Sequence, residues 1–401
     1  MENNKIGWLT RVSVLFIFLL NVETSLVNTA LGEIAKAFPG TDPVLINLVS
    51  SFPTFFSLAL ALAIGKLAEK YDKKTLVLIS LVIYIVGGLG GAFFNGSIGM
   101  ILAMRALVGI GAGISAPLCG SVIADLFVDK DDRAKMFGWS NGFSSLLAVV
   151  ITMLAGWLCS INWTYTFLAY GVFIIVLLLE MYALPSLPPV AAVKEKEEVK
   201  EKPHYTTKQK VKLALMGLYV LCNLMVGMLL FMKMPILMMQ ENLGSPVAIG
   251  TAFSVTTALA CISSLAFGYI VKIFKRYTLA IYSILTAMAF FTLYNAHSAE
   301  MVILAFAFNG FGMGMMMPAL QLKAVSTGPK ANATYATSIV IGALFVGQIL
   351  ATFVEKALAD SSPRGLFLFG TIMFVIYTVA YLVWVFANPE KDTPADISAE
   401  A

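Results

Sequence analysis

The sequence predicts an all-α membrane protein with twelve transmembrane helices in two six-helix halves, and three observations lead to this fold class. First, 59% of the 401 residues are hydrophobic and 12% are charged, with a mean hydropathy of +0.85. Soluble domains carry about 25% charged residues. Second, long apolar runs recur along the whole chain, each able to cross about 30 Å of hydrocarbon. Third, the two halves of the chain carry matching glycine motifs.

This composition excludes several classes of protein. A chain so apolar cannot cover a water-facing surface, so a soluble enzyme, a secreted disulfide scaffold and a nucleic-acid-binding protein are excluded. We expect no enzymatic activity, no cofactor and no metal site. The cysteines lie inside apolar runs and are expected to be small buried hydrophobic residues without disulfide bonds; they are Cys119, Cys159, Cys222 and Cys261.

Glycines, prolines and charges divide the chain into twelve apolar segments. Each segment is expected to be a helix, because lipid offers no hydrogen-bond partners to the backbone. Continuous apolar runs also argue against the alternating strands of a β-barrel. The first segment is not expected to be a cleavable signal peptide, because it is too long and carries Glu23. The segments are 11–37, 44–68, 75–95, 98–127, 134–159, 163–184, 210–239, 247–274, 278–295, 300–325, 332–357 and 365–387.

Basic residues predict the orientation in the membrane. With a cytoplasmic N-terminus, 22 of the 27 Lys and Arg residues lie on the cytoplasmic side. Lys36, Lys356 and Arg364 would lie outside, whereas Arg105 and Lys233 fall within spans. This asymmetry follows the positive-inside rule and places both termini of a multi-pass cell-membrane protein in the cytoplasm. It also accounts for the net charge of +4 without an anionic partner.

The middle of the chain divides it into two halves. Residues 185–209 are rich in charge and carry several prolines, which is typical of a cytoplasmic linker. The predicted units are therefore an N-terminal six-helix half at 1–184, the linker at 185–209, and a C-terminal half with a short cytoplasmic tail at 210–401.

The two halves repeat one another. The run from Gly109 to Pro117 reads G-x-G-x-G-x-x-x-P, and the same pattern runs from Gly310 to Pro318, an offset of 201 residues. Small residues at these spacings let neighbouring helices approach closely. Parallel six-helix halves around a midplane site are the architecture of many secondary transporters.

The loop between the second and third segments, residues 65–74, reads G-K-L-A-E-K-Y-D-K-K. This run resembles a signature of the major facilitator superfamily, G-x-L-A-D-R-x-G-R-R, although Glu69 replaces Asp and Asp72 replaces Gly. The resemblance covers essentially the whole chain. It implies a latch that closes the cytoplasmic side, formed by Gly65, Glu69, Lys73, Lys74 and Asp125. Glu69 and Lys73 can pair if the helix continues.

Two further motifs resemble the drug:proton antiporters of this superfamily. Residues 23–31 read E-T-S-L-V-N-T-A-L, and residues 105–111 read R-A-L-V-G-I-G, similar to the group's R-x-x-Q-G-x-G. The G-P-x-x-G-G signature of the fifth span is missing, because residues 151–156 read I-T-M-L-A-G. The resemblance therefore implies the superfamily more firmly than it implies antiport.

Three ionisable residues lie at membrane depth, where a charge costs at least about 2.5 kcal/mol. Glu23 is expected to be the only acid deep inside a span. Helix rise places it at nearly the depth of Arg105, so we expect these two residues to form a proton-coupling pair facing the cavity, or a static pair between spans one and four. Lys233 is expected either to face the substrate or to extend to the interface.

Isolated polar residues are candidate substrate ligands, alongside Arg105 and Lys233. Each of them either lines a central cavity or bonds one helix to another. The C-terminal half is also rich in methionine, whose flexible thioether suits varied apolar ligands and equally fills a core. The polar candidates are Asn141, Ser145, Asn223, Asn309 and Gln348.

The sequence thus predicts a secondary active transporter that works by alternating access. We expect export of a lipophilic or amphiphilic small molecule in exchange for protons, by a monomer in the lipid bilayer. Uptake or exchange of a small organic anion is the first alternative, because the spans contain two cationic residues and only one acidic residue at membrane depth. A non-transporting receptor with the same fold is a remote alternative.

Overall fold

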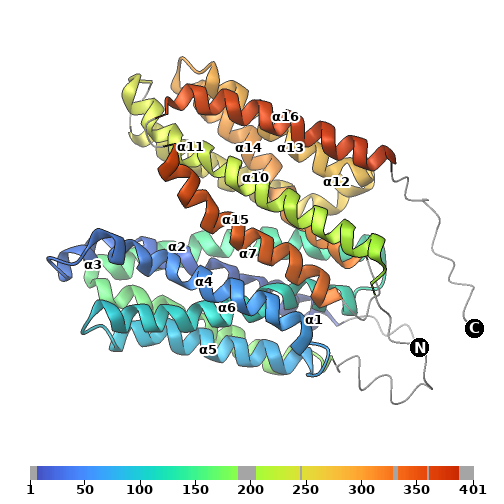
Figure 1. Cartoon of the computed structure of the whole chain (residues 1–401). Coiled ribbons are helices and arrows are strands. Elements are labelled where there is room, and N and C mark those ends of the chain that lie inside the picture. The colour runs from blue at the N-terminus through green and yellow to red at the C-terminus, as the bar shows by residue number, and fades with distance from the viewer. Residues whose placement is uncertain (1–6, 188–204, 244–245, 328–332, 359–360, 388–401) are drawn as a thin grey trace, which may run out of the picture.

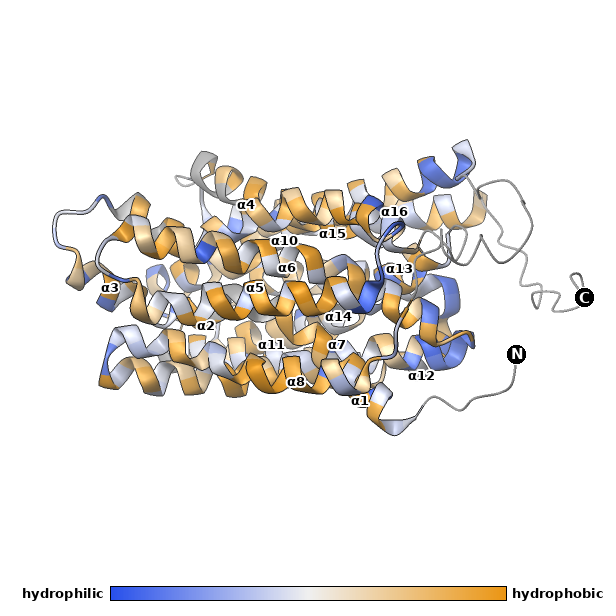
Figure 2. Cartoon of the chain, turned by 90° about the horizontal axis from the view of Figure 1, so that it is seen from below, coloured by the Kyte–Doolittle hydropathy of each residue, from blue (hydrophilic) through white to orange (hydrophobic). Residues whose placement is uncertain are grey.

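The computed structural model describes residues 7–187, 205–243, 246–327, 333–358 and 361–387, and over these ranges the chain is helical without strands. Eleven helices within the described ranges are long and apolar enough to cross a membrane. Figure 2 shows that hydrophobic residues cover the middle of the bundle and that hydrophilic residues gather towards its ends. The chain is a multi-pass membrane protein, and the expected all-α fold class is confirmed.

The N-terminal helices follow the predicted segments closely except at the first and the sixth. The first is broken into an α-helix, a 3₁₀ stretch and a second α-helix, and another short helix follows it. The sixth begins as a 3₁₀ stretch and continues as an α-helix. A 3₁₀ stretch within a helix often marks a functional hinge. The elements are α1 (Trp8–Ile17), η1 (Phe18–Val22), α2 (Glu23–Asn28), α3 (Leu31–Ala37), α4 (Pro43–Leu67), α5 (Lys73–Phe93), α6 (Ile98–Leu126), α7 (Lys130–Ile161), η2 (Trp163–Gly171) and α8 (Val172–Ala183).

The C-terminal helices show one further break, at Ala266, where the predicted 247–274 segment divides into two helices. The predicted linker lies largely outside the described residues. The next helix begins at Thr207 with a capping box, in which the Thr206 hydroxyl accepts from the Gln209 backbone amide. The elements are α10 (Thr207–Gln240), α11 (Pro246–Leu265), α12 (Phe267–Phe274), η3 (Lys275–Tyr277), α13 (Thr278–Tyr294), α14 (Ala299–Val325), α15 (Ala333–Ala357) and α16 (Pro363–Ala387).

Each half has its own apolar core. One cluster of buried side chains comes almost wholly from α1 to α8, and another comes almost wholly from α10 to α16. Figure 1 shows the halves as two helical layers, with α1 beginning and α16 ending at the same end of the molecule. We call that end the terminal side and the other end the distal side.

The glycine repeat performs the same packing in both halves. A β-carbon at Gly109 of α6 would lie 2.2 Å from the Pro53 carbonyl oxygen of α4. A β-carbon at Gly310 of α14 would lie 2.5 Å from the Thr256 carbonyl oxygen of α11. Such distances are too short for any side chain, so only glycine allows these helix pairs to touch. The predicted close approach is confirmed at equivalent places in the two halves.

Candidate functional site: the interface between the halves

The two halves touch through glycines on the terminal side. A β-carbon at Gly138 of α7 would lie 2.4 Å from the Ser264 carbonyl oxygen of α11. A β-carbon at Gly120 of α6 would lie 2.7 Å from the Thr337 γ-methyl of α15. The missing side chains of these glycines let the helices of the two halves pack closely on the terminal side.

A small set of polar contacts joins the same surfaces. The Ser264 hydroxyl donates to the Gly138 carbonyl at 3.0 Å, and the Thr337 hydroxyl donates to the Pro117 carbonyl at 2.8 Å. The Lys272 ammonium of α12 lies 2.7 Å from the Asp131 carboxylate of α7.

These contacts all fall on the terminal side. The hydrogen bonds and the ion pair named here come from the terminal parts of their helices. Figure 1 shows the ribbons of the two halves diverging towards the distal side.

A cavity of about 390 Å³ lies in the wedge where α7 and α11 separate. Its lining is apolar with a few hydroxyl groups, near the middle of both helices. Secondary transporters bind substrate at such midplane positions between their halves. The lining residues are Ser145, Leu146 and Val149 of α7 and Phe253, Ser254, Thr257, Ala258 and Cys261 of α11.

Asn141 and Ser145 occupy successive turns at the floor of this wedge. The Asn141 side-chain amide donates to the Gln321 side-chain oxygen of α14 at 3.1 Å, across the boundary between the halves. The Ser145 hydroxyl donates to the Asn141 carbonyl at 2.9 Å and borders the cavity. Ser145 is therefore placed where a ligand in the wedge would touch it, whereas Asn141 belongs to the closed contact below.

Arg105 is buried inside the N-terminal half, with 1% of its surface exposed. Its Nε donates to the Val49 carbonyl of α4 at 2.9 Å, and one Nη donates to the Tyr170 hydroxyl of η2 at 2.6 Å. Tyr170 packs beside Tyr84 at 5.4 Å between ring centroids. The guanidinium is therefore held in a fixed position beside the broken first span.

Glu23 is the first residue of α2, directly after the 3₁₀ stretch η1. Its side chain lies outside the described part of the structure, so the predicted pair with Arg105 stays a prediction. The backbone places it suitably, because α2 packs against α6, the helix that carries Arg105, and also against α4 and α7.

Lys233 of α10 is buried, and its ammonium donates to the Leu358 carbonyl just after the end of α15 at 3.1 Å. A cation at this position favourably meets the partial negative charge of a helix C-terminus. This geometry ties α10 to α15 on the distal side. The substrate-facing role of Lys233 stays a prediction.

The remaining polar candidates are distributed between core and surface. Asn223 and Asn309 are buried within the C-terminal half, and their amides donate to the Tyr219 carbonyl and the Met313 thioether, respectively. Gln348 of α15 is exposed. It lies three residues after Phe345, on the face that α15 presents to the N-terminal half. Gln348 is thus the one best placed to meet a ligand between the halves.

The predicted latch residues lie on the terminal side. The Lys73 ammonium is buried and lies 2.5 Å from the Asp125 carboxylate, a contact between α5 and α6. The Lys74 ammonium donates to the Met181 carbonyl of α8 at 2.9 Å. Both contacts stay within the N-terminal half.

Of the other two predicted latch residues, Gly65 contacts the C-terminal half and Glu69 does not lie in a helix. A β-carbon at Gly65 would lie 3.3 Å from the Ser338 hydroxyl of α15, so this glycine reaches the other half. Glu69 is exposed in a turn, because α4 ends at Leu67. The helix therefore does not continue to Lys73, and the condition for a Glu69–Lys73 pair within one helix is not met.

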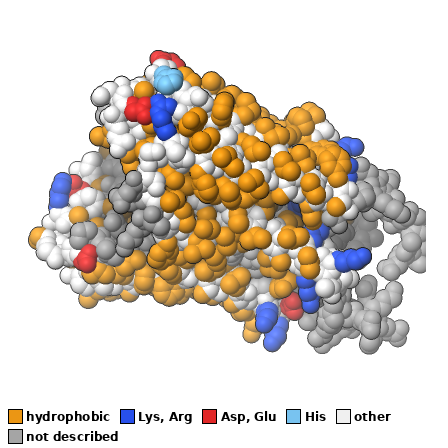
Figure 3. All heavy atoms as spheres, turned by 45° about the horizontal axis from the view of Figure 1, so that its top comes forward, with side chains coloured by type: hydrophobic (Ala, Val, Ile, Leu, Met, Phe, Trp, Pro, Cys, Tyr) orange, Lys and Arg blue, Asp and Glu red, His pale blue; other side chains and the backbone are white. Residues whose placement is uncertain are grey.

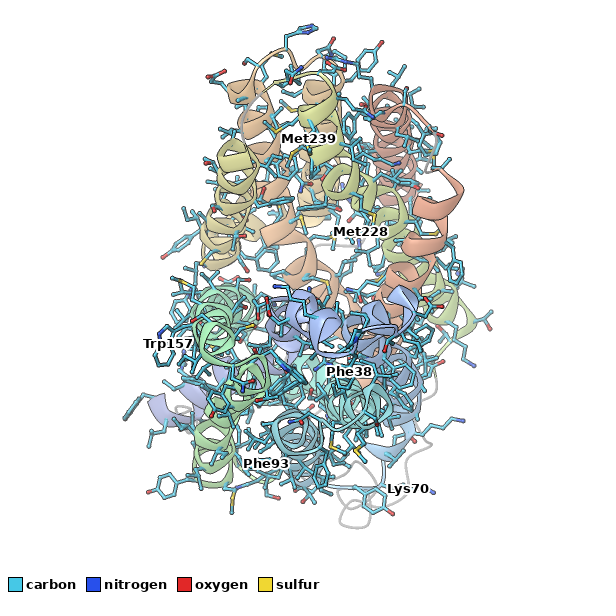
Figure 4. The ribbon with its side chains drawn as sticks, turned by 90° about the vertical axis from the view of Figure 1, so that its left-hand side faces the viewer. Phe38, Lys70, Phe93, Trp157, Met228 and Met239 are labelled. Carbon is cyan, nitrogen blue, oxygen red and sulfur yellow. The ribbon has the colours of Figure 1, made fainter. Side chains whose placement is uncertain are left out.

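The methionines of the C-terminal half serve mixed roles. Met234, Met238 and Met315 are buried in the core of that half. Figure 4, viewed from the distal side, shows Met239 in the C-terminal half far from the boundary and Met228 of α10 near the edge that faces the other half. The methionine content of this half therefore mainly fills its core.

Sequence reasoning missed one buried acid. Glu180 of α8 is fully buried, and its two carboxyl oxygens have no hydrogen-bond partner among the described residues. Glu180 lies three residues before the end of α8, so it is a buried acid near the end of a span, and the expectation that Glu23 is the only acid deep inside a span stays a prediction. The signal was present as a single acid in the apolar run from Val172 to Ala183. It lies near the end of that run, and packing against neighbouring helices encloses it.

The chain is similar in sequence to a family model and to several known proteins. Residues 13–232 and 215–401 match the family model described as Major Facilitator Superfamily. The methylenomycin A resistance protein of Bacillus subtilis (strain 168) is 29% identical over 161 residues, covering 37% of this chain and 34% of that protein. The multidrug transporter protein MdtP of the same strain is 26% identical over 155 residues, covering 38% and 28%. The aligned stretch spans about a third of these curated relatives.

Solved structures agree on the fold. The crystal structure of the human organic anion transporter MFSD10 (TETRAN) superposes with a TM-score of 0.73 over 94% of this chain and 100% of that chain, at 16% identity. At this identity the likeness concerns the fold alone.

Proposed function

This chain belongs to the Major Facilitator Superfamily, and from that premise we propose that it is a transporter exporting a lipophilic or amphiphilic small molecule in exchange for protons. Its resistance-protein and multidrug-transporter relatives support the export of such compounds. The transport class follows from the family, whereas substrate, direction and coupling are the proposal.

The observation that carries the proposal is the uneven contact between the halves. Their described polar contacts lie on the terminal side, and the cavity at the α7–α11 wedge lies at mid-depth, directly beyond that closure. A midplane substrate cavity between the two halves is what alternating access requires. Its apolar lining with a few hydroxyls suits a lipophilic ligand with one or two polar groups.

The polar contacts that close the terminal side between the two halves are individually weak. Its ion pair, Lys272 with Asp131, is about half exposed, and exposed pairs contribute only about 0.2–1 kcal/mol. The hydroxyl bonds of Ser264 and Thr337 contribute about 1 kcal/mol each. Contacts this modest allow the halves to rock apart on the terminal side while the distal side closes.

The orientation of the cycle depends on which side is cytoplasmic. We propose that both termini lie in the cytoplasm, so the structure corresponds to the outward-open state. Figure 3 supports this with a concentration of Lys and Arg side chains at the terminal end of the molecule, beside the broad apolar belt. The latch then acts on the cytoplasmic side, where Gly65 meets α15.

We assign proton coupling to Glu23, with Arg105 as its positioning residue. The fixed guanidinium stabilises the charged carboxylate, whereas a closed apolar surrounding favours the neutral form. Rocking of the halves changes water access to α2, so proton affinity differs between the states. Linkage then makes proton and substrate affinities depend on one another.

The organic-anion alternative receives less support. It rests on two cations against one acid within the spans, and Glu180 adds a buried acid near the end of a span. It also needs Arg105 and Lys233 to reach the ligand, whereas both donate to groups of the protein.

Proteoliposomes with an imposed pH gradient test the proposal, using fluorescent lipophilic compounds that are cationic, neutral or anionic. Glu23→Gln should abolish uphill transport and leave downhill exchange. Glu33→Gln is the matched control, because Glu33 is an exposed acid paired with Lys36 on the distal surface. Uphill transport by the Glu23 variant would mean that another group or ion drives the cycle. Uphill uptake of the anionic compound alone would favour the organic-anion alternative.

A further inference from the structure

A second cavity, separate from the interface between the halves, lies within the C-terminal half. It has a volume of about 250 Å³ and is enclosed by α10, α13, α14 and α16 near the terminal side. Leu215 and Leu218 of α10 line it and are also exposed on the outer surface of the bundle. The cavity therefore opens sideways towards the lipid, between α10 and α16.

The terminal end of this cavity is cationic and aromatic. The Lys323 ammonium of α14 lies 4.2 Å from the ring centroid of Trp384 and 4.8 Å from that of Tyr381. It also donates to the Tyr381 hydroxyl at 2.9 Å. The Lys212 ammonium of α10 lies 5.7 Å from the Trp384 ring centroid. Two ammonium groups from different helices thus converge on one indole, each within cation–π range.

The rest of the cavity is apolar and extends towards the middle of the membrane. On α10 the lining runs from Lys212 to Cys222, a rise of about 15 Å at 1.5 Å per residue. Two tyrosine hydroxyls of the lining are hydrogen-bonded to other protein groups. The Tyr219 hydroxyl bonds to the Ser283 hydroxyl, and the Tyr377 hydroxyl donates to the Cys222 carbonyl. The cavity is cationic at the membrane surface and hydrophobic below it.

We propose that this cavity binds an anionic phospholipid of the terminal-side leaflet. Its phosphate would meet Lys212 and Lys323, and one acyl chain would lie along the apolar wall between α10 and α16. The order of charges and apolar surface along the membrane normal matches that of a lipid. Basic pockets between transmembrane helices are known to bind anionic headgroups. The basic surroundings of the terminal side raise the local concentration of such lipids.

The alternative for these side chains is simple anchoring, because Lys, Tyr and Trp are common at membrane interfaces. Anchoring requires neither convergence on one ring nor an apolar channel open to the lipid. It also predicts no preference between lipids with the same chains, so the two explanations separate by experiment.

Native mass spectrometry of the full chain in detergent tests the site. Palmitoyl-oleoyl-phosphatidylglycerol is the probe, phosphatidylcholine with the same chains is its neutral match, and inorganic phosphate tests the headgroup alone. We expect tighter binding of phosphatidylglycerol, weakened about fivefold by Lys323→Gln and by Lys212→Gln. Lys210→Gln is the matched control, because Lys210 is an exposed lysine of the same helix that does not line the cavity.

Each outcome decides the proposal. Equal binding of the two phospholipids, or an equal loss in Lys210→Gln, would overturn it in favour of general surface charge. Equal binding of inorganic phosphate would show a headgroup site without the acyl chain. If a lysine variant fails to fold, Ala380→Phe narrows the channel on α16 and should lower phosphatidylglycerol binding without changing the charge. Unchanged binding in that variant would also contradict the proposal. The readout is independent of transport.

Discussion

Gly138→Ala perturbs the terminal closure at its tightest helix contact. The added β-carbon would lie 2.4 Å from the Ser264 carbonyl oxygen and 2.7 Å from the Phe267 β-carbon. Ordinary contacts begin at 3.4 Å, so α7 and the α11–α12 segment must separate by about 1 Å. Overpacking of this kind costs about 1–3 kcal/mol. The hydrogen bond from Ser264 to the Gly138 carbonyl is strained by the same shift.

That cost applies only where the halves are closed on the terminal side. The equilibrium between access states should therefore shift about 5- to 150-fold towards the state open on that side. Gly156→Ala is the matched control on the same helix, because a β-carbon there has nothing within 4 Å. It improves helix propensity without touching the other half.

Distances between spin labels measure the shift in a chain whose native cysteines are replaced. Labels at exposed Lys70 and Lys208 report the terminal side, and labels at exposed Gly96 and His297 report the distal side. Gly138→Ala should lengthen the first distance and shorten the second, and Gly156→Ala should change neither. Identical distributions in both variants would refute the idea that this contact controls access. If Gly138→Ala does not fold, Ser264→Ala tests the same closure with a smaller change in the same direction.

Three further predictions follow from the buried and surface charges. Glu180→Gln should leave thermal stability in detergent unchanged or raised, because a buried carboxyl without hydrogen-bond partners among the described residues gains nothing from its charge; a marked loss would reveal an essential partner. The Arg364 guanidinium holds the pKa of Glu241 below its ordinary value, so this pair stabilises the fold above about pH 4.3 and the contribution is lost as pH falls through the lowered pKa. Glu241→Gln should lower the free energy of unfolding by about 0.5 kcal/mol after solvent screening. It should also weaken the dependence of that free energy on pH in the acid range, and an unchanged pH dependence would contradict the prediction. Cysteines introduced in the linker at 185–209 should react only with reagents on the cytoplasmic side of intact cells, and labelling from outside would reverse the orientation.

The positions of the spans could be predicted from the sequence because the requirement is local. A backbone in lipid must satisfy its own hydrogen bonds, and a long apolar run does so as a helix. The close helix packing at the glycine repeat could also be predicted from the sequence, since Gly109 and Gly310 mark places where only a hydrogen atom fits between helices. The broken first span was not predicted, because nothing in its composition separates η1 from the α-helices around it.

The partners of the charged and polar residues were decided by the tertiary structure. In a membrane bundle the outer and inner faces of a helix are both apolar, so periodicity does not reveal which face meets protein. The sequence identified Arg105 and Lys233 as charged residues within spans. Their hydrogen bonds to Val49, Tyr170 and Leu358 depend on helices that are distant in the chain. The contact of Asn141 with Gln321 needs the two halves to meet. The sequence alone determined which residues must be helical and which are costly to bury, whereas the packing of the halves decided which of them can meet a ligand, because that depends on surfaces formed only when distant helices come together.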